Sequence, residues 1–249
     1  MTCIHSSALR RVVWCAFALA LFAAGAGAQT QRAADPAALE RALGAEIDRF
    51  VEADRAAPPA VCQVLFVGSS SIVKWRQSLA ADMAPMPVID RGFGGSHIEY
   101  VSRWFDEIVA PYRPRAIVFY AGENDIDAGK SVARVVADFD AFMARKTQVL
   151  GRTPVYFISL KPSKLRFAQF PLQSQVNGAI RARAGTRSDL HYIDVVSPML
   201  ENGNPKDIFE PDGLHMTAAG YRIWTRAVRA ALDPNTEADE RRCRQANHH

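Results

Sequence analysis

Short apolar runs alternate with longer amphipathic stretches along most of the chain. Four to six apolar residues bounded by glycine, proline or charge are typical of strands buried on both faces of a sheet. Runs of four or five residues occur at 64–67, 116–120, 155–158 and 192–195, and a shorter one occurs at 88–89. Because helical stretches separate most of them, the pattern predicts a parallel sheet with helices on both sides.

The amphipathic stretches predict the helices of this arrangement. A four-residue spacing of Leu39, Leu43, Ile47 and Val51 predicts a helix from 36 to about 51. The clearest helical face combines Val132, Val135, Val136, Phe139, Phe142 and Met143. A last helix follows Thr217 and places Trp224, Ala227, Val228 and Ala231 on one face. Since neither a repeat nor a linker interrupts the alternation, we expect one α/β domain.

The first 28 residues have the organisation of a secretory signal peptide. Arg10 and Arg11 precede an apolar run at 12–24, and the small residues 26–28 follow. The run is too short for a comfortable membrane span, which makes a retained anchor the weaker alternative. We therefore expect cleavage after Ala28, export to the periplasm or the medium, and no integral membrane segment in the mature chain.

Composition narrows the class of protein further. The chain has 249 residues, 49% hydrophobic and 22% charged, which is ordinary for a globular protein. Two of its 30 basic residues fall in the signal segment, so 28 basic residues face 26 acidic ones in the mature chain. Nucleic-acid binders concentrate basic charge on one face, so this balance does not indicate one. We expect an N-terminal lead and helix at 29–61, the main domain at 62–233 and a charged, solvated tail at 234–249.

Four loops carry the candidate chemistry, because active sites of parallel sheets lie at the carboxyl ends of the strands. They are Gly68-Ser69-Ser70-Ser71-Ile72, Arg91-Gly92-Phe93-Gly94-Gly95-Ser96, Gly122-Glu123-Asn124-Asp125 and, before the last helix, Asp212-Gly213-Leu214-His215. Each loop alone has a structural explanation, since serine caps helices, glycine permits tight turns and Asn-Asp pairs favour loops.

In combination and in this order, the four loops resemble the blocks of the SGNH (GDSL-type) hydrolase family. The first two are similar to those of the bacterial branch related to platelet-activating-factor acetylhydrolases. The resemblance extends from about residue 64 to 232. It implies a flavodoxin-like three-layer α/β/α sandwich with a parallel sheet of about five strands, an esterase-type activity and no cofactor.

The resemblance assigns a role to five residues. The nucleophile corresponds to Ser70, the oxyanion donors to the Gly95 backbone N–H and the Asn124 side chain, and the general-base pair to Asp212 and His215. The family usually has Asp between the glycine and the nucleophile, where this chain has Ser69. We expect that difference to alter local hydrogen bonding rather than the chemistry. Glu123 occupies a variable position, and no role is expected for it.

The same residues make chemical sense without the resemblance. A serine hydroxyl needs an adjacent base to act as a nucleophile, and His215 can take the proton of Ser70. Asp212, three residues away, can fix the imidazole tautomer. Backbone N–H groups at Ser70 and Gly95, with the Asn124 amide, can stabilise the oxyanion, and a helix that begins at Ser70 favours the anion too.

A metal site is the main chemical alternative. Asp212, His215 and His97 are all of ligand type for zinc. Such a site would leave the serine, glycine and asparagine loops unexplained, so we expect no metal. For His97 itself, a solvated loop position is the simpler interpretation.

The substrate is less defined than the reaction. Lys161, Ser163, Lys164 and Arg166 follow the fourth strand, and they form either a basic rim for anionic substrates or a solvated loop. The resemblance favours short acyl groups, acetyl above all. We expect an exported serine esterase acting on small-molecule, glycan or lipid esters, with an O-acyltransferase of envelope glycans and a catalytically idle binding module as alternatives.

Two cysteines remain in the mature chain. In the expected fold, Cys62 enters the first strand at the end of the sheet opposite the active site. The last helix runs about 25 Å back to that end, which brings Cys243 within reach. A disulfide between them is our hypothesis, and a buried thiol at Cys62 with a loose one in the tail is the alternative.

Overall fold

A five-stranded parallel sheet organises the computed structural model, which describes residues 36–246. The strands are β1 (Val64–Gly68), β2 (Val88–Gly92), β3 (Ala116–Tyr120), β4 (Val155–Ile158) and β5 (Leu190–Ile193), in the spatial order β2-β1-β3-β4-β5. That order is the flavodoxin-like one, and it confirms the expected fold class. The expected signal peptide at 1–28 lies outside the described residues.

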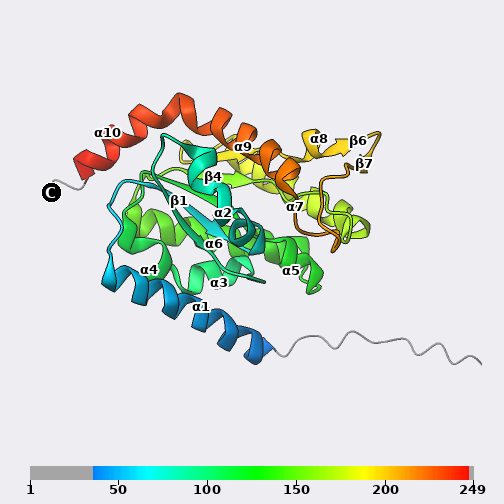
Figure 1. The fold of residues 1–249 in the computed structure, drawn as a ribbon, viewed down its shortest axis with the longest axis horizontal. Coiled ribbons are helices and arrows are strands. Elements are labelled where there is room, and N and C mark those ends of the chain that lie inside the picture. Colours follow the sequence, from blue (N-terminus) through cyan, green and yellow to red (C-terminus); the bar gives the residue numbers. More distant parts are fainter. Residues whose placement is uncertain (1–35, 247–249) are drawn as a thin grey trace, which may run out of the picture. The chain divides into compact units, whose positions relative to one another are not determined.

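Helices form a layer on each side of the sheet. One layer pairs α2 (Ser70–Met83) with α9 (Ala218–Leu232), and the other joins α3 (Ile98–Arg103), α4 (Phe105–Ile108), α6 (Val132–Leu150) and α7 (Phe170–Ala184). Right-handed crossovers between parallel strands account for this division. The first helix, α1 (Pro36–Ala56), packs on α4. In Figure 1, α9 runs along the upper edge of the view and α1 along the lower.

The core lies between the sheet and these layers. Every residue of β1, β3 and β4 is buried. Phe119, Phe139, Phe142 and Phe157 pack in one aromatic cluster that attaches α6 to the sheet, as its predicted apolar face requires. Trp75 and Trp224 contact edge to face and fill the space between α2 and α9.

Shorter elements complete the fold around the loops. These are the helices α5 (Glu123–Asp127) and α8 (Val196–Met199), and the two-stranded antiparallel ribbon of β6 (Leu200–Glu201) and β7 (Asn204–Pro205). The fifth strand begins and ends two residues earlier than predicted. It ends before Asp194 because that carboxylate accepts hydrogen bonds from the N–H groups of Val196 and Ser197, which turns the chain.

The C-terminal segment differs from the solvated tail that the sequence suggested. Residues Thr236–Ala246 form a helix, α10, in which Asp239 and Cys243 are buried. Cys243 forms a disulfide with Cys62, with their Cα atoms 5.7 Å apart, so the hypothesised bond is present. This bond attaches α10 to the segment that leads into β1.

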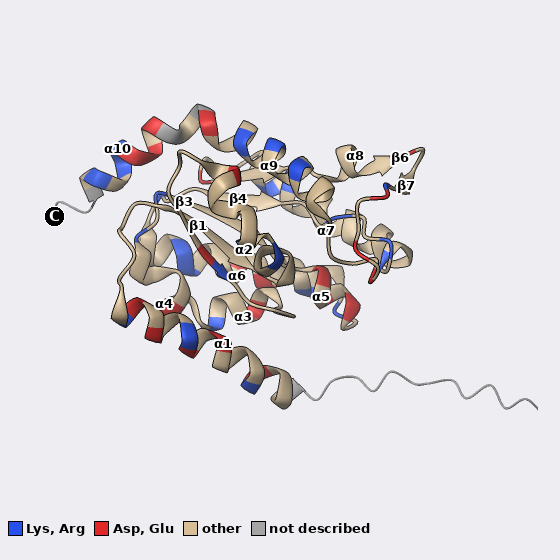
Figure 2. Ribbon diagram, viewed as in Figure 1, with Lys and Arg blue, Asp and Glu red and all other residues tan. Residues whose placement is uncertain are grey.

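Charge is distributed unevenly over the outer helices. Figure 2 shows basic and acidic residues mixed along α1 and α10, whereas α9 carries basic residues without acidic ones. Among the helices described, not one combines the length and apolar character that crossing a membrane would need.

Candidate active site

Three neighbouring strands end at the same level and bring three of the predicted loops together. Gly68, at the end of β1, pairs in register with Gly92 of β2 and Tyr120 of β3. The backbone requires glycine at position 68, because φ is +142° and a Cβ there would lie 1.9 Å from the Tyr120 carbonyl oxygen. The N–H of Ser69 donates to the same carbonyl at 2.9 Å, which fixes the turn into α2.

Ser70 is the first residue of α2 and lies at the helix N-terminus. Ser69 occupies the N-cap position with extended backbone, but its side chain makes no capping hydrogen bond. Ser71 is a buried residue of the first helical turn, and its hydroxyl accepts a hydrogen bond from Lys161 at 3.2 Å. Of the three serines, Ser70 alone contacts the histidine of the last loop.

The Asp212–His215 loop reaches Ser70 from the start of α9. His215 Nε2 lies 2.9 Å from Ser70 Oγ, and its Nδ1 lies 2.6 Å from Asp212 Oδ2. The other oxygen of Asp212 accepts the backbone N–H groups of Leu214 and His215. Partial burial opposes ionisation of Asp212, but these hydrogen bonds outweigh it and lower its pKa to about 2. The carboxylate is therefore ionised at neutral pH.

The two predicted oxyanion residues, Gly95 and Asn124, are linked through Ser96, which follows Gly95 in the chain. Asn124 Nδ2 donates to the carbonyl of Ser96 at 3.0 Å, which ties the asparagine to the loop of Gly95. Gly95 has a φ of +75°, a conformation that favours glycine. The neighbouring Gly94 N–H donates to Glu46 of α1 at 3.3 Å, so the first helix also holds this loop.

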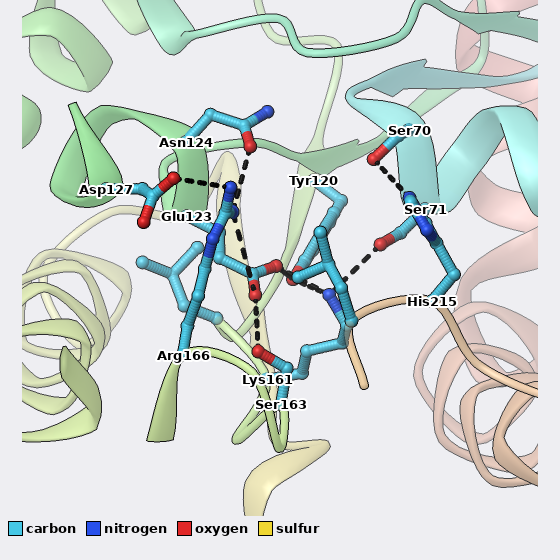
Figure 3. Close-up of polar contacts among 12 residues, drawn as sticks. Ser70, Ser71, Tyr120, Glu123, Asn124, Asp127, Lys161, Ser163, Arg166 and His215 are labelled. Atoms are coloured by element: carbon cyan, nitrogen blue, oxygen red, sulfur yellow. Dashed lines mark hydrogen bonds and ion pairs between the residues drawn. The ribbon is translucent and has the colours of Figure 1, made fainter. Parts of the chain in front are cut away.

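A buried polar network lies beneath these loops (Figure 3), and sequence analysis missed its centre, Glu123. Its carboxylate accepts hydrogen bonds from the Tyr120 hydroxyl at 2.7 Å, Lys161 Nζ at 2.5 Å and the Ser163 hydroxyl at 2.9 Å. Burial favours the neutral acid, but the charges of Lys161 and Arg166 outweigh it and lower the pKa of Glu123. The site thus rests on a buried ion pair.

Arg166 connects this network to Asn124. Its Nη1 donates to Asn124 Oδ1 at 2.9 Å and lies 4.0 Å from Glu123, while its Nη2 donates to Asp127 at 2.8 Å. Figure 3 shows the Arg166 side chain extending upward between Glu123 and Asn124. Both ends of the Asn124 amide are therefore held, by Ser96 and by Arg166.

The segment after β4 is neither the free basic rim nor the solvated loop considered from the sequence. Lys161 and Ser163 are fully buried against Glu123, because this carboxylate offers them a partner inside the fold. Lys164 is exposed and pairs with Asp207 at 2.6 Å. The expected strand order could have indicated this pairing, since the carboxyl ends of β3 and β4 are adjacent in a flavodoxin-like sheet.

His97 also differs from the expectation of a solvated loop residue. It stands at the N-cap position of α3, its side chain is only 12% exposed, and it packs on the Tyr100 ring. This burial lowers its pKa. Within residues 36–246, no group of three or more His, Cys, Asp or Glu side chains could hold a metal ion, so the zinc alternative has no ligand cluster there.

Comparisons with known proteins bear on the family and on the fold. The sequence model of the GDSL-like Lipase/Acylhydrolase family matches residues 66–223. None of the curated proteins searched matches the chain. Solved structures with the same fold include a protein from Streptococcus pneumoniae whose name refers to platelet activating factor. It is 16% identical, with a TM-score of 0.70 over 78% of this chain and 94% of the Streptococcus protein.

Two further structures have related descriptions. A GDSL-like lipase from Bacteroides thetaiotaomicron is 20% identical, with a TM-score of 0.65 over 76% of this chain and 97% of the lipase. An acetylxylan esterase from Geobacillus stearothermophilus is 13% identical, with a TM-score of 0.56 over 69% of this chain and 94% of the esterase. At these identities the likeness concerns the fold.

Proposed function

Because the chain belongs to the GDSL-like lipase/acylhydrolase family, whose members are ester-hydrolysing serine hydrolases, we propose that it cleaves short acyl esters, acetyl above all, at Ser70. The observation that carries this proposal is the continuous contact from Ser70 Oγ through His215 to Asp212. A hydroxyl, an imidazole and an ionised carboxylate in this order are the parts that acyl transfer through serine requires.

The first half of the reaction forms an acyl-enzyme. Ser70 Oγ attacks the acyl carbon while His215 Nε2 takes its proton, and the ionised Asp212 stabilises the resulting imidazolium through Nδ1–H. When the tetrahedral intermediate collapses, the same proton passes to the leaving alcohol. In the second half, His215 activates a water that attacks the acyl carbon, and acetate leaves as Ser70 regains its proton.

The intermediate carries its negative charge on the former carbonyl oxygen. We assign its stabilisation to the backbone N–H groups of Ser70 and Gly95 and to Nδ2 of Asn124. Nδ2 carries two hydrogens and gives one of them to Ser96, so it can direct the other to the substrate. The position of Ser70 at the start of α2 adds the favourable field of the helix N-terminus.

Two further observations support the proposed preference for acetyl groups and the proposed location of the reaction. The acetylxylan esterase from Geobacillus stearothermophilus acts on an acetylated glycan and has this fold. The N-terminal 28 residues have the order of an export signal. We therefore place the reaction outside the cytoplasm, on acetylated glycans or lipids of the envelope.

The test uses the chain from Gln29 and p-nitrophenyl esters from acetyl to dodecanoyl. We expect activity that falls with chain length and that disappears in Ser70→Ala. Ser69→Ala is the matched control, since it removes the neighbouring hydroxyl and should retain activity. Activity that survives in Ser70→Ala, or that rises towards dodecanoyl, would contradict the proposal.

A further inference from the structure

A cavity of about 440 Å³ lies at the end of the sheet opposite Ser70. Its walls are the segment that leads into β3 (113–115), the end of α6 with the loop after it (149–153) and one side of α10. Arg115 immediately precedes β3 and Thr153 precedes β4, so the cavity is at the amino ends of the strands. A five-residue strand is about 16 Å long, which separates this cavity from the candidate active site.

Positive charge dominates the lining. Four arginines contribute to it, namely Arg113, Arg115, Arg152 and Arg242, against one carboxylate, that of Asp239. Asp239 is already engaged, because it accepts hydrogen bonds from Arg242 at 2.7 Å and from the Tyr156 hydroxyl at 3.3 Å. Within the described residues, neither Arg113 nor Arg152 has an ion-pair partner.

Of the four arginines, Arg115 is buried and yet only weakly paired. Its side chain is only 5% exposed, yet its one ion-pair partner in residues 36–246 is Glu240 at 3.7 Å, beyond hydrogen-bond distance. Glu240 is shared with Arg244, which donates a hydrogen bond to it. A buried guanidinium has five N–H donors and is costly to desolvate unless they are paired. Arg115 thus offers donors into a cavity where other arginines are unpaired.

We infer that this cavity binds a multivalent oxyanion, a small molecule or polymer end that carries phosphate or carboxylate groups. The planar guanidinium pairs with two oxygens of either group at once, and several arginines around one cavity can bind more than one group. The volume lies in the range of small-molecule sites. The inference concerns a second binding site and does not depend on the proposed hydrolysis.

The wall formed by α10 is held in place covalently. Cys243, which lines the cavity, is bonded to Cys62 beside the first strand. A smaller cavity of about 140 Å³ shares Arg152, Asp239 and Arg242 with the larger one and adds His191. The arginines therefore belong to a preformed surface, and a ligand would not need to order a loose tail in order to bind.

Isothermal titration calorimetry with pyrophosphate and, separately, citrate at low ionic strength tests the inference. We expect one saturable site per chain for at least one of the two anions. The double variant Arg113→Gln/Arg152→Gln should weaken binding at least tenfold. Both residues are exposed and unpaired, so folding should be unaffected, which circular dichroism checks. The matched control is Arg222→Gln/Arg226→Gln, which removes two exposed arginines of α9 outside the cavity.

The outcomes distinguish specific binding in the cavity from nonspecific electrostatic binding. Saturable binding that is lost in the cavity variant and kept in the α9 variant supports the site. Equal weakening in both variants, or no saturation with either anion, overturns it. Sedimentation with phosphatidylcholine vesicles containing phosphatidylglycerol then distinguishes the sources, because cavity-dependent sedimentation indicates a lipid headgroup and its absence indicates a soluble anion. Hydrolysis of p-nitrophenyl acetate should be the same in all three proteins.

Discussion

Replacing Arg166 with alanine tests how the oxyanion amide is held. The substitution removes the hydrogen bond from Arg166 to Asn124 Oδ1 and leaves the one from Nδ2 to Ser96. A hydrogen bond with one charged partner contributes about 1.5–3 kcal/mol. Since Ser96 still restrains the amide, we expect a loss of about 1.4 kcal/mol of transition-state stabilisation, which is about tenfold in kcat. Because the bond orients a donor that we propose acts in the transition state, KM should change little.

The largest loss of kcat that Arg166→Ala could cause through Asn124 is the loss caused by removing the Asn124 amide itself. Asn124→Ala removes the proposed oxyanion donor and should lower kcat by a factor of about 10²–10³. If Arg166 acts through Asn124, adding Arg166→Ala to Asn124→Ala should reduce kcat by less than twofold further. Arg183→Ala is the control, because Arg183 is a half-buried arginine whose partners within residues 36–246 are Asp140 and its own helix, away from Asn124.

The assay measures kcat and KM for p-nitrophenyl acetate in wild type and the four variants, with thermal unfolding to detect damage to the fold. Guanidinium added at millimolar concentration should restore part of the activity of Arg166→Ala. A full tenfold loss in the Asn124→Ala background would refute the reasoning. So would a rise in KM with kcat unchanged, which would indicate a contact with the substrate instead.

Three further predictions concern stability. Lys161→Met leaves the Glu123 carboxylate buried without its nearer cation and should lower the free energy of unfolding by about 3–5 kcal/mol in urea titrations; adding Glu123→Gln should recover part of it. Cys243→Ser opens the bond to Cys62 and should cost about 2–5 kcal/mol, whereas reduction of wild type that left the urea midpoint unchanged would contradict this. The pKa of Asp212 is about 2 in the folded protein, below its unfolded value near 3.9, so its stabilising effect is complete above about pH 4 and is lost as pH falls towards 2. Wild type should therefore lose stability more steeply than Asp212→Asn over that range.

The sequence predicted those parts of the fold that depend on apolar pattern. Runs of four or five apolar residues located β1, β3 and β4 because these strands are buried on both faces. The predicted position of the fifth strand was two residues too late. Polar His191 lies inside the strand, and Asp194, which ends it, follows apolar residues. The four loops were found because each directly follows a strand or precedes a helix.

The parts that were missed depend on pairing between distant charges. Helix α10 has no apolar period, because its buried face consists of Asp239, bonded to Tyr156, and of Cys243. Glu123 and Lys161 are 38 positions apart, and nothing in either local sequence indicates that both are buried. A charged residue in a loop is usually solvated, and only the adjacency of β3 and β4 reveals the partner.

The disulfide also changes the distance between Ser70 and His215 along the chain. These residues are 145 positions apart, but Cys62 lies shortly before Ser70 and Cys243 shortly after α9. Measured through the sulfur bridge, the path between them is about a quarter as long, which lowers the entropic cost of closing that loop by about 1.2 kcal/mol. An oxidised chain that unfolds therefore keeps its serine and histidine as near neighbours in contour length. The bond thus acts on the recovery of the active site after unfolding as well as on the stability of the folded state.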